Sequence, residues 1–307
     1  MIVDDKSEHV VPFLLRLLEQ HRNAPRSNGE PVRPFIVGLN GVQGAGKTTL
    51  VSALQKTLRS PPYSLPTAVI SIDDFYLTHA DQERLAASDP ANPLIQHRGQ
   101  PSTHDLPLAR ETLAALRDRR PDVPIPVYDK SAFNGAGDRA PQAQWEKVNE
   151  GEERVDFVLL EGWCVGFRAL EDADLEKKWA TAKEKAERDG EACKGRLGRE
   201  RLEHVRFVNE KLRDYDEVTN MLDAFVFIDA EDTQYVYDWR MQQERALRAD
   251  KGTGMTDDQV INFVNGYYPA YELYSEILRQ GALPGKKGVQ LNLTVGKDRR
   301  VKHVEIQ

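Results

Sequence analysis

Residues 41–48 read GVQGAGKT and fit the pattern G-x-x-x-x-G-K-[ST] of a phosphate-binding loop. Glycines let backbone N–H groups close around phosphate oxygens, because a Cβ atom would block that approach. We expect Lys47 to reach the β- and γ-phosphates of a nucleotide and Thr48 to offer its hydroxyl to Mg²⁺. The residues expected to hold the nucleotide are Gly41, Gln43, Gly44, Ala45, Gly46, Lys47, Thr48 and Thr49.

The surroundings of this loop support nucleotide binding but leave the reaction open. An apolar run at 35–40 precedes the loop and a helical pattern at 47–58 follows it, which is the context that the motif requires. The sequence contains neither an N-K-x-D stretch for guanine nor the SGGQ signature of transporter ATPases. These two classes are therefore disfavoured, while several other reactions of P-loop proteins remain open.

Carboxylates follow two of the predicted strands at the point where each strand ends. Asp73 and Asp74 come after the β-branched run 67–72, and Glu161 ends the apolar run that starts at 155. Ligands bind beyond the carboxyl ends of parallel strands, so these side chains should lie near the γ-phosphate. Asp73 or Asp74 could accept the proton of an attacking hydroxyl or hold Mg²⁺, and Glu161 matches the Walker-B position at the metal. The alternative for the two aspartates is a turn that caps a helix.

The elements that must position these residues alternate between strand and helix patterns. Apolar runs of strand length occur at 35–40, 67–72, 155–160, 224–228 and 290–295, and we expect the last run to end the sheet. Helical spacing occurs at 10–22, 47–58, 106–117, 233–248 and 257–279. This alternation predicts an α/β fold, with a mostly parallel, doubly wound sheet and helices on both faces.

Two segments enlarge this core. Residues 90–105 form a long polar stretch, and long loops in compact domains are usually functional or disordered. Residues 171–201 hold nine acidic and nine basic residues, which predicts a charged, solvated helical insert at 171–205. Binding of a partner is the alternative for that insert.

The composition excludes several classes of protein. The chain has 307 residues, with 42 Lys and Arg against 49 Asp and Glu, and a formal net charge of −7. Nucleic-acid binders are usually basic and membrane spans need longer apolar runs, so we expect neither nucleic acid nor a membrane as a partner. The two cysteines, Cys164 and Cys193, offer no disulfide framework, and the acidic N-terminus is unlike a signal or transit peptide. We expect a cytoplasmic protein that can also enter the nucleus by diffusion.

Several longer strings resemble a known family. The P-loop, DDFY at 73–76 and EG at 161–162 resemble the branch of small-molecule kinases with uridine kinase, phosphoribulokinase and bacterial-type pantothenate kinase. Within that branch, RGQPSTHD at 98–105, PVYDKS at 126–131 and GAGDR at 135–139 resemble segments of plant-type D-glycerate 3-kinases and their fungal ATP-dependent relatives. WRMQQE at 239–244, GMTD at 254–257 and YPAY at 268–271 resemble C-terminal blocks of the same family. The resemblance implies a P-loop kinase domain at 33–307, preceded by a leading helix and linker at 1–32.

This resemblance implies a kinase that uses ATP and Mg²⁺ and phosphorylates D-glycerate to 3-phosphoglycerate. Asp73 would activate the acceptor hydroxyl, Lys47 would hold the phosphates, and Glu161 would support the metal shell formed with Thr48 and Asp73. Two alternatives stay open. One is a kinase of the same branch for another small alcohol, such as a nucleoside, a pantothenate-like acid or a sugar. The other is an ATP-binding regulatory protein with little turnover.

An anionic hydroxy acid such as glycerate needs fixed cations and hydrogen-bond donors in its pocket. Loops between the predicted strands carry such groups, and His104 could orient a hydroxyl beside them. The residues expected to bind the acceptor are Arg98, Asp105, Tyr128, Lys130 and Arg139. The alternative for each of them is a surface ion pair of little energetic consequence.

A basic helix that runs into a glycine-bearing loop predicts a lid at about 240–258. Arg240, Arg245, Arg248 and Lys251 precede Gly252 in this segment. Closure would bring cations to the transferring phosphoryl group and exclude water. We expect Arg240 to act in catalysis because it lies in the family block 239–244; a solvated basic face is the alternative.

Overall fold

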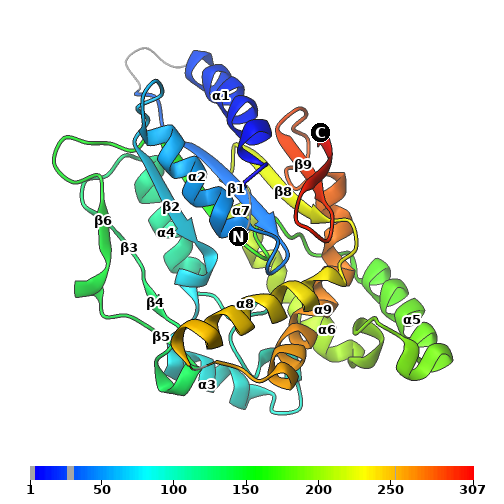
Figure 1. The fold of residues 1–307 in the computed structure, drawn as a ribbon. Coiled ribbons are helices and arrows are strands. Elements are labelled where there is room, and N and C mark those ends of the chain that lie inside the picture. The colour runs from blue at the N-terminus through cyan, green and yellow to red at the C-terminus, as the bar shows by residue number, and fades with distance from the viewer. Residues whose placement is uncertain (1–3, 26–30, 253) are drawn as a thin grey trace.

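A six-stranded sheet forms the centre of the computed structural model, which describes residues 4–25, 31–252 and 254–307. Its strands are β1 Phe35–Gly41, β2 Thr67–Ser71, β7 Phe157–Gly162, β8 Ala224–Ala230, β9 Gln290–Val295 and β10 Val301–Ile306. They lie in the order β10-β9-β8-β1-β7-β2, and each neighbouring pair is parallel except β9 with β10 (Figure 1). The predicted α/β fold with a mostly parallel sheet is confirmed.

The strand β1 lies in the middle of the sheet and all of its residues are buried. Continuous burial is what a parallel strand needs when helices cover both faces of its sheet, which explains the apolar run in the sequence. The expectation that residues 290–295 end the sheet is wrong. β10 follows β9 and pairs with it in antiparallel register at the edge, where most of its residues face solvent and no apolar run is needed.

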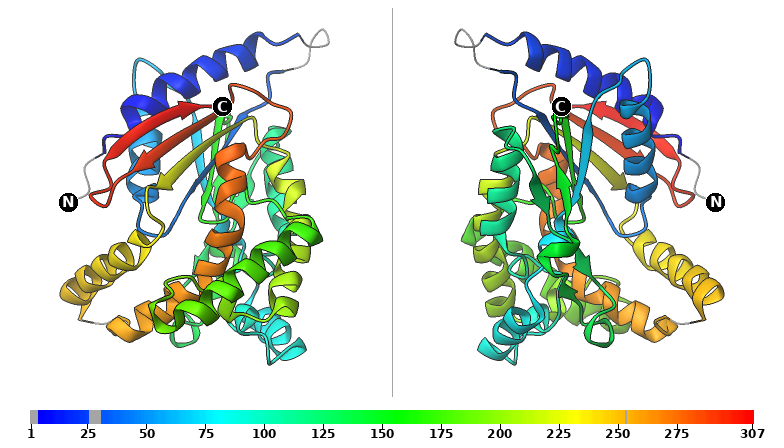
Figure 2. Two further views of the ribbon diagram at one scale, coloured as in Figure 1. Left: turned by 90° about the vertical axis from the view of Figure 1, so that its right-hand side faces the viewer. Right: turned by 90° about the vertical axis from the view of Figure 1, so that its left-hand side faces the viewer.

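Helices cover both faces of the sheet, as predicted (Figure 2). On one face lie α1 Ser7–Asn23 and α2 Lys47–Arg59; the other face carries α4 Leu106–Arg117, α7 Asp216–Thr219 and α9 Asp257–Gln280. The remaining α-helices are α3 His79–Ser88, α5 Asp172–Asp189, α6 Leu202–Leu212 and α8 Tyr235–Lys251. Single 3₁₀ turns are η1 Ile72–Phe75, η2 Pro93–Ile95, η3 Phe133–Gly135, η4 Gln142–Gln144, η5 Gly190–Ala192, η6 Leu197–Arg199 and η7 Arg213–Tyr215.

Two small antiparallel pairs between α4 and β7 were not predicted from the sequence. β3 Val123–Ile125 pairs with β6 Glu146–Val148, and β4 Tyr128–Asp129 pairs with β5 Asp138–Arg139. Strands of two or three residues are too short to show an alternating pattern. They matter because the turn between β4 and β5 begins at Lys130, a predicted acceptor ligand.

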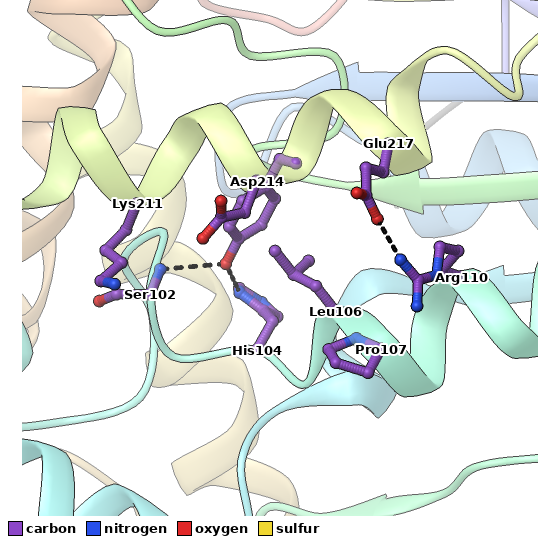
Figure 3. A pocket seen from close by; sticks show the side chains of 9 residues that line it. Ser102, His104, Leu106, Pro107, Arg110, Lys211, Asp214 and Glu217 are labelled. Carbon is purple, nitrogen blue, oxygen red and sulfur yellow. Dashed lines mark hydrogen bonds and ion pairs between the residues drawn. The ribbon is translucent and has the colours of Figure 1, made fainter.

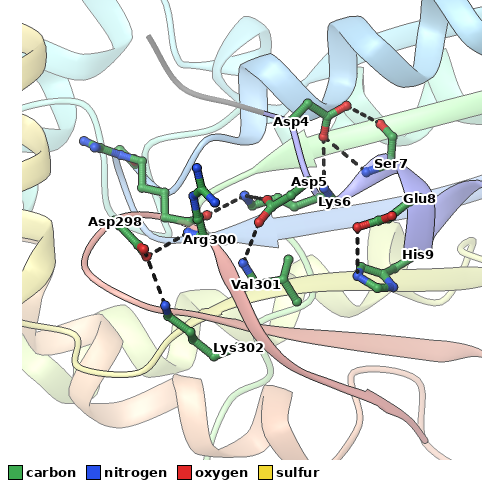
Figure 4. A network of polar contacts seen from close by, with 12 residues as sticks. Asp4, Asp5, Lys6, Ser7, Glu8, His9, Asp298, Arg300, Val301 and Lys302 are labelled. Atoms are coloured by element: carbon green, nitrogen blue, oxygen red, sulfur yellow. Dashed lines mark hydrogen bonds and ion pairs between the residues drawn. The ribbon is translucent and has the colours of Figure 1, made fainter.

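The leading helix α1 packs on the body of the protein. The apolar stripe expected from its spacing (Val10, Phe13, Leu14, Leu17 and Leu18) is buried in the main core. Ahead of the helix, the Asp5 carboxylate accepts a hydrogen bond from the Val301 N–H, and the Lys6 ammonium donates to the Arg299 carbonyl at 2.7 Å (Figure 4). These contacts attach the N-terminal segment to the turn between β9 and β10. Residues 26–30 of the predicted linker lie outside the described residues.

The stretch 90–105 is more buried than a solvated loop would be, whereas most residues of the insert helix α5 are exposed. In the stretch 90–105, Asn92, Gln100, Thr103 and His104 are buried. The insert forms α5, whose Leu175 is buried, and continues through η5 and η6 to the start of α6. Among the described residues, the helices are all too short or too polar to cross a membrane.

Candidate active site

The carboxyl ends of three neighbouring strands bring the predicted catalytic residues together. In the sheet register, Glu161 of β7 lies between Leu39 of β1 on one side and Ser71 of β2 on the other. The P-loop therefore starts two residues beyond Leu39, and Asp73 lies two residues beyond Ser71. Glu161, Asp73 and the P-loop therefore lie together at the carboxyl ends of the parallel strands, where ligands bind in such folds.

The P-loop has the backbone conformation that its glycines allow. Gly44 has φ of 81° and Gly46, the N-cap of α2, has φ of 100°, both in the left-handed region. The first turn of α2 contains no acidic residue, so its free N–H groups and partial positive charge are available to an anion. The Lys47 ammonium donates to the carbonyls of Gly41 at 2.7 Å and Val42 at 3.4 Å. This cradle fits the phosphates of a nucleotide.

Two residues that sequence analysis missed hold the P-loop from outside. A Cβ atom on Gly44 would lie 2.5 Å from the Trp239 Cβ, so α8 packs directly against the loop. The Arg299 Nε donates to the Gly44 carbonyl at 2.7 Å, and the same guanidinium lies over the Trp239 ring. Arg299 is 255 residues away from Gly44 in the chain, and no local pattern signals such a contact.

Two lysines and two carboxylates create the electrostatic environment beside the P-loop. The Lys130 Nζ lies 2.5 Å from the Asp73 Oδ2. Burial alone raises the pKa of Asp73, but the charge and hydrogen bond of Lys130 outweigh it, and the pKa falls below its ordinary value. Burial lowers the pKa of Lys47, while the negative charges of Glu161 and Asp73 oppose that shift. Asp73 is thus ionised at neutral pH and next to cations.

Asp74 lies in a different environment from Asp73. Its carboxylate accepts a hydrogen bond from the Tyr128 N–H at 3.4 Å and so faces β4. Burial raises the pKa of Asp74 to about 6. The cap of the short helix η1 is neither aspartate, because the Ser71 hydroxyl accepts the Asp73 N–H. The alternative that one of these aspartates caps the helix η1 is therefore wrong.

Arg98 is engaged by the turn between β4 and β5. Its guanidinium donates to the carbonyls of Gly135, Ala136 and Lys130 and lies over the Tyr128 ring. Tyr128 is itself buried. In this conformation Arg98 shapes the turn that carries Lys130, rather than presenting a free guanidinium to an acceptor carboxylate as the sequence suggested.

Arg139 and Asp105, both predicted to bind the acceptor, bind each other in the structure. The Arg139 Nη1 lies 3.1 Å from the Asp105 Oδ2, and Arg139 also donates to the Tyr76 carbonyl at 2.9 Å. Asp105 caps α4 through the Leu108 N–H. The pair joins β5, the segment after Asp74 and the start of α4, so its contacts are structural. A sequence alone gives no sign that two such charges are neighbours.

The predicted basic lid is largely neutralised within the described residues. Arg240 pairs with the buried Glu244 at 2.9 Å and lies over the Phe263 ring. Arg245 and Arg248 both pair with Asp257, at the start of α9. Arg245 and Arg248 thus pair with an acidic residue instead of forming an unpaired basic face, and the lid at about 240–258 stays a prediction. Thr253 and the side chain of Lys251 lie outside the described residues.

Comparison with known proteins gives the family. No family model matches the chain. The chain is 40% identical over 268 residues to a protein of Schizosaccharomyces pombe named "Uncharacterized kinase mug58", covering 87% of this chain and 88% of that protein. It is 37% identical over 255 residues to the chloroplastic D-glycerate 3-kinase of Arabidopsis thaliana, covering 82% of this chain and 50% of that longer protein.

A solved structure extends the similarity to the whole fold. The D-glycerate 3-kinase of Cryptococcus neoformans aligns with a TM-score of 0.88 and 34% identity, over 99% of this chain and 100% of that chain. The sheet order, the P-loop and the carboxylates at the strand ends agree with a kinase of this type. The chain therefore belongs to the D-glycerate 3-kinase family, within the branch of ATP-dependent P-loop kinases.

Proposed function

We propose that this kinase transfers the γ-phosphoryl group of ATP to D-glycerate and forms 3-phosphoglycerate. The observation that carries the proposal is the Asp73 carboxylate, paired with Lys130 at the end of β2 and close to Lys47 and Glu161. A kinase acceptor site needs a carboxylate base next to the phosphate-binding loop, and an anionic acceptor needs a cation at the same place. The names of the relatives supply the choice of glycerate.

The P-loop would hold the triphosphate. Backbone N–H groups of residues 43–49 would surround the β- and γ-phosphates, and the Lys47 ammonium would exchange its bonds to the Gly41 and Val42 carbonyls for phosphate oxygens. That exchange keeps the Lys47 ammonium hydrogen-bonded throughout. The absence of acidic residues from the first turn of α2 favours the bound anion.

Thr48, Asp73 and Glu161 offer the oxygen ligands that suit Mg²⁺. The part of the chain that the structure describes contains no cluster of three His, Cys, Asp or Glu side chains able to bind a metal alone. In the proposal the phosphates complete the coordination. When bound, the ion neutralises phosphate charge during transfer.

Asp73 would be the general base. The C3 hydroxyl of glycerate loses its proton to the Asp73 carboxylate while its oxygen bonds the γ-phosphorus, and the bond from that phosphorus to ADP breaks. A base that is ionised at neutral pH can act in this way, and the pKa of Asp73, held low by Lys130 against burial, keeps it ionised. Asp74 is the second candidate, but its carboxylate is directed to the backbone of Tyr128.

Lys130 and Arg240 would supply cations in turn. Lys130 is more than half exposed, so its ammonium can bind the carboxylate of an arriving acceptor while it stays next to Asp73. Arg240 follows Trp239, which packs on the P-loop, and would reach the transferring phosphoryl group from α8. With both cations in place, the reactants would be held in line and surrounded by positive charge. Positioning and charge stabilisation are most of what phosphoryl transfer requires.

The test is ADP release by the purified protein with ATP, Mg²⁺ and a panel of acceptors. We expect D-glycerate to stimulate ADP release strongly, and uridine, pantothenate and simple sugars to leave the rate near background. Stimulation by one of those other acceptors, without an effect of D-glycerate, would contradict the choice of substrate. Tight ATP binding without stimulation by any acceptor would support a regulatory ATP-binding protein instead.

A further inference from the structure

His104 is a buried residue of the stretch 98–105 that contacts two other segments of the chain. It is 5% exposed and its ring stacks on Tyr76 with 4.4 Å between centroids. A backbone bridge also joins His104 to Tyr76, and the Nδ1 atom lies 2.6 Å from the Tyr215 hydroxyl (Figure 3). Three independent contacts therefore fix the position and orientation of this imidazole.

The Tyr215 hydroxyl determines which ring nitrogen carries the proton. Its oxygen already accepts a hydrogen bond from the Ser102 N–H at 3.1 Å. Donation to the His104 Nδ1 is the arrangement in which the phenol proton also finds an acceptor among the described residues. The Nδ1 then has no proton of its own, and the neutral ring carries its proton on Nε2. Burial lowers the pKa of His104 to about 4, which agrees with a neutral ring.

The Nε2–H has no partner among the described residues although the atom is buried. Leaving a buried donor without an acceptor is unfavourable, so such groups call for an explanation. This nitrogen lies on the side of the ring away from Tyr215. The bridge partner Tyr76 is three residues after Asp73, and a second hydrogen bond, from the Asp105 N–H to the Phe75 carbonyl, keeps the two segments together. The unpartnered donor thus belongs to the segment next to the proposed base.

We propose that the His104 Nε2–H donates a hydrogen bond to an oxygen of the acceptor other than the hydroxyl that attacks ATP. This inference rests on the proposed function and adds a substrate-binding residue to it. An uncharged donor suits this position because it can orient the acceptor without pairing with Asp73. Lys130 shows the alternative, since its ammonium pairs with Asp73 directly at 2.5 Å.

Kinetics of three variants test the contact. His104→Ala should raise the KM for the acceptor about ten- to a hundredfold, the loss expected when a donor to a substrate oxygen is removed, with ATP affinity unchanged. His104→Gln keeps an N–H near the Nε2 position and should recover most of that loss. His204→Ala is the matched control, because His204 is also buried, has an unpartnered nitrogen and lies on α6 outside the stretch 98–105. An unchanged acceptor KM in His104→Ala, or equal effects of the His104 and His204 variants, would overturn the proposal.

Acceptor analogues identify the oxygen. 3-Hydroxypropionate lacks the C2 hydroxyl of glycerate, and glycerol lacks the carboxylate. If the C2 hydroxyl accepts the hydrogen bond, His104→Ala should cost nothing further with 3-hydroxypropionate; if the carboxylate accepts it, the same should hold with glycerol. An undiminished effect of His104→Ala with both analogues would mean that neither oxygen contacts His104, and the proposal would be wrong.

A measurement on the free protein separates this inference from the choice of glycerate. NMR of protein labelled with ¹⁵N in its imidazoles, with His104 assigned from His104→Gln, should show the Nε2–H tautomer at pH 7. Tyr215→Phe should weaken that preference. An Nδ1–H tautomer or a charged ring would overturn the inference whatever the substrate is. If D-glycerate fails to stimulate the wild-type protein, the proposed function fails, and the same variants are compared with whichever acceptor of the panel is phosphorylated.

Discussion

Replacing Gly44 with Ala should damage both the stability of the protein and its affinity for ATP. Gly44 has φ of 81°, and a side chain in this region costs about 1–2 kcal/mol. Its new Cβ would also lie 2.5 Å from the Trp239 Cβ and 3.2 Å from the Trp239 carbonyl carbon. Trp239 is fully buried on α8, so relief requires a shift of the backbone, and overpacking of this kind costs a further 1–3 kcal/mol or so.

A matched control isolates the second contribution. Gly151 has φ of 58°, and nothing lies within 4 Å of a Cβ atom added there. Gly151→Ala therefore carries the backbone cost alone. In urea unfolding, Gly44→Ala should lose about 1–3 kcal/mol more than Gly151→Ala.

The same strain should appear in nucleotide binding. The P-loop can relieve the contact by moving away from Trp239, which takes its N–H groups out of the geometry that surrounds phosphate. We expect isothermal titration calorimetry to show ATP bound at least about tenfold more weakly by Gly44→Ala, a loss of about 1.4 kcal/mol, and unchanged by Gly151→Ala. Equal stabilities of the two variants, together with wild-type ATP affinity in Gly44→Ala, would refute the idea that α8 holds the P-loop in place.

Four further variants and a pH profile of the wild-type protein test the charges of the site. Asp73→Asn should lower acceptor-dependent ADP release about 10²- to 10⁴-fold while ATP affinity, measured by calorimetry, stays within about threefold of wild type; near-normal turnover would remove Asp73 from the mechanism. Wild-type kcat/KM should stay flat from pH 8 down to about 5, because the pKa of Asp73 lies below its ordinary value, whereas a decline that starts near pH 6 would indicate Asp74 as the base. Lys130→Met removes the largest contribution that lowers the pKa of Asp73, so burial should raise that pKa against the remaining charge of Lys47, and the pH-rate profile should begin to fall at a higher pH than in wild type. Arg139→Met and Asp105→Asn should lower the melting temperature in a non-additive way and leave the acceptor KM nearly unchanged, because the two side chains bind each other; a large rise in acceptor KM would restore them to the acceptor pocket.

Much of the fold follows from local patterns in the sequence. The apolar run before the glycines became β1, and the helix that starts at Lys47 became α2, because strand and helix spacing reports burial on short stretches of chain. The short strands β3 to β6 were missed because two or three residues carry no period. The edge strand β10 was missed for the opposite reason, since its exposed residues need no apolar run.

The sequence could predict a site residue only where that residue acts next to its own motif. Lys47 and Glu161 are placed by the strands that precede them, and the sequence indicates both. Contacts between segments that are distant in the chain leave no such local signal in the sequence. Arg299 binds the P-loop across 255 residues, and Arg245 pairs with Asp257 across the α8–α9 connection. Charge along α8 suggested an unpaired basic face, but the partner of Arg245 and Arg248 belongs to α9, the next element.

The direct test of the central proposal is to follow the labelled phosphoryl group itself. The protein is incubated with ATP labelled with ³²P at the γ-phosphate, Mg²⁺ and D-glycerate, and the products are separated by chromatography. The account predicts one labelled 3-phosphoglycerate for each ADP formed, and loss of that product in Asp73→Asn. Label that appears only as inorganic phosphate, or ADP formed at the same rate without any acceptor, would contradict it.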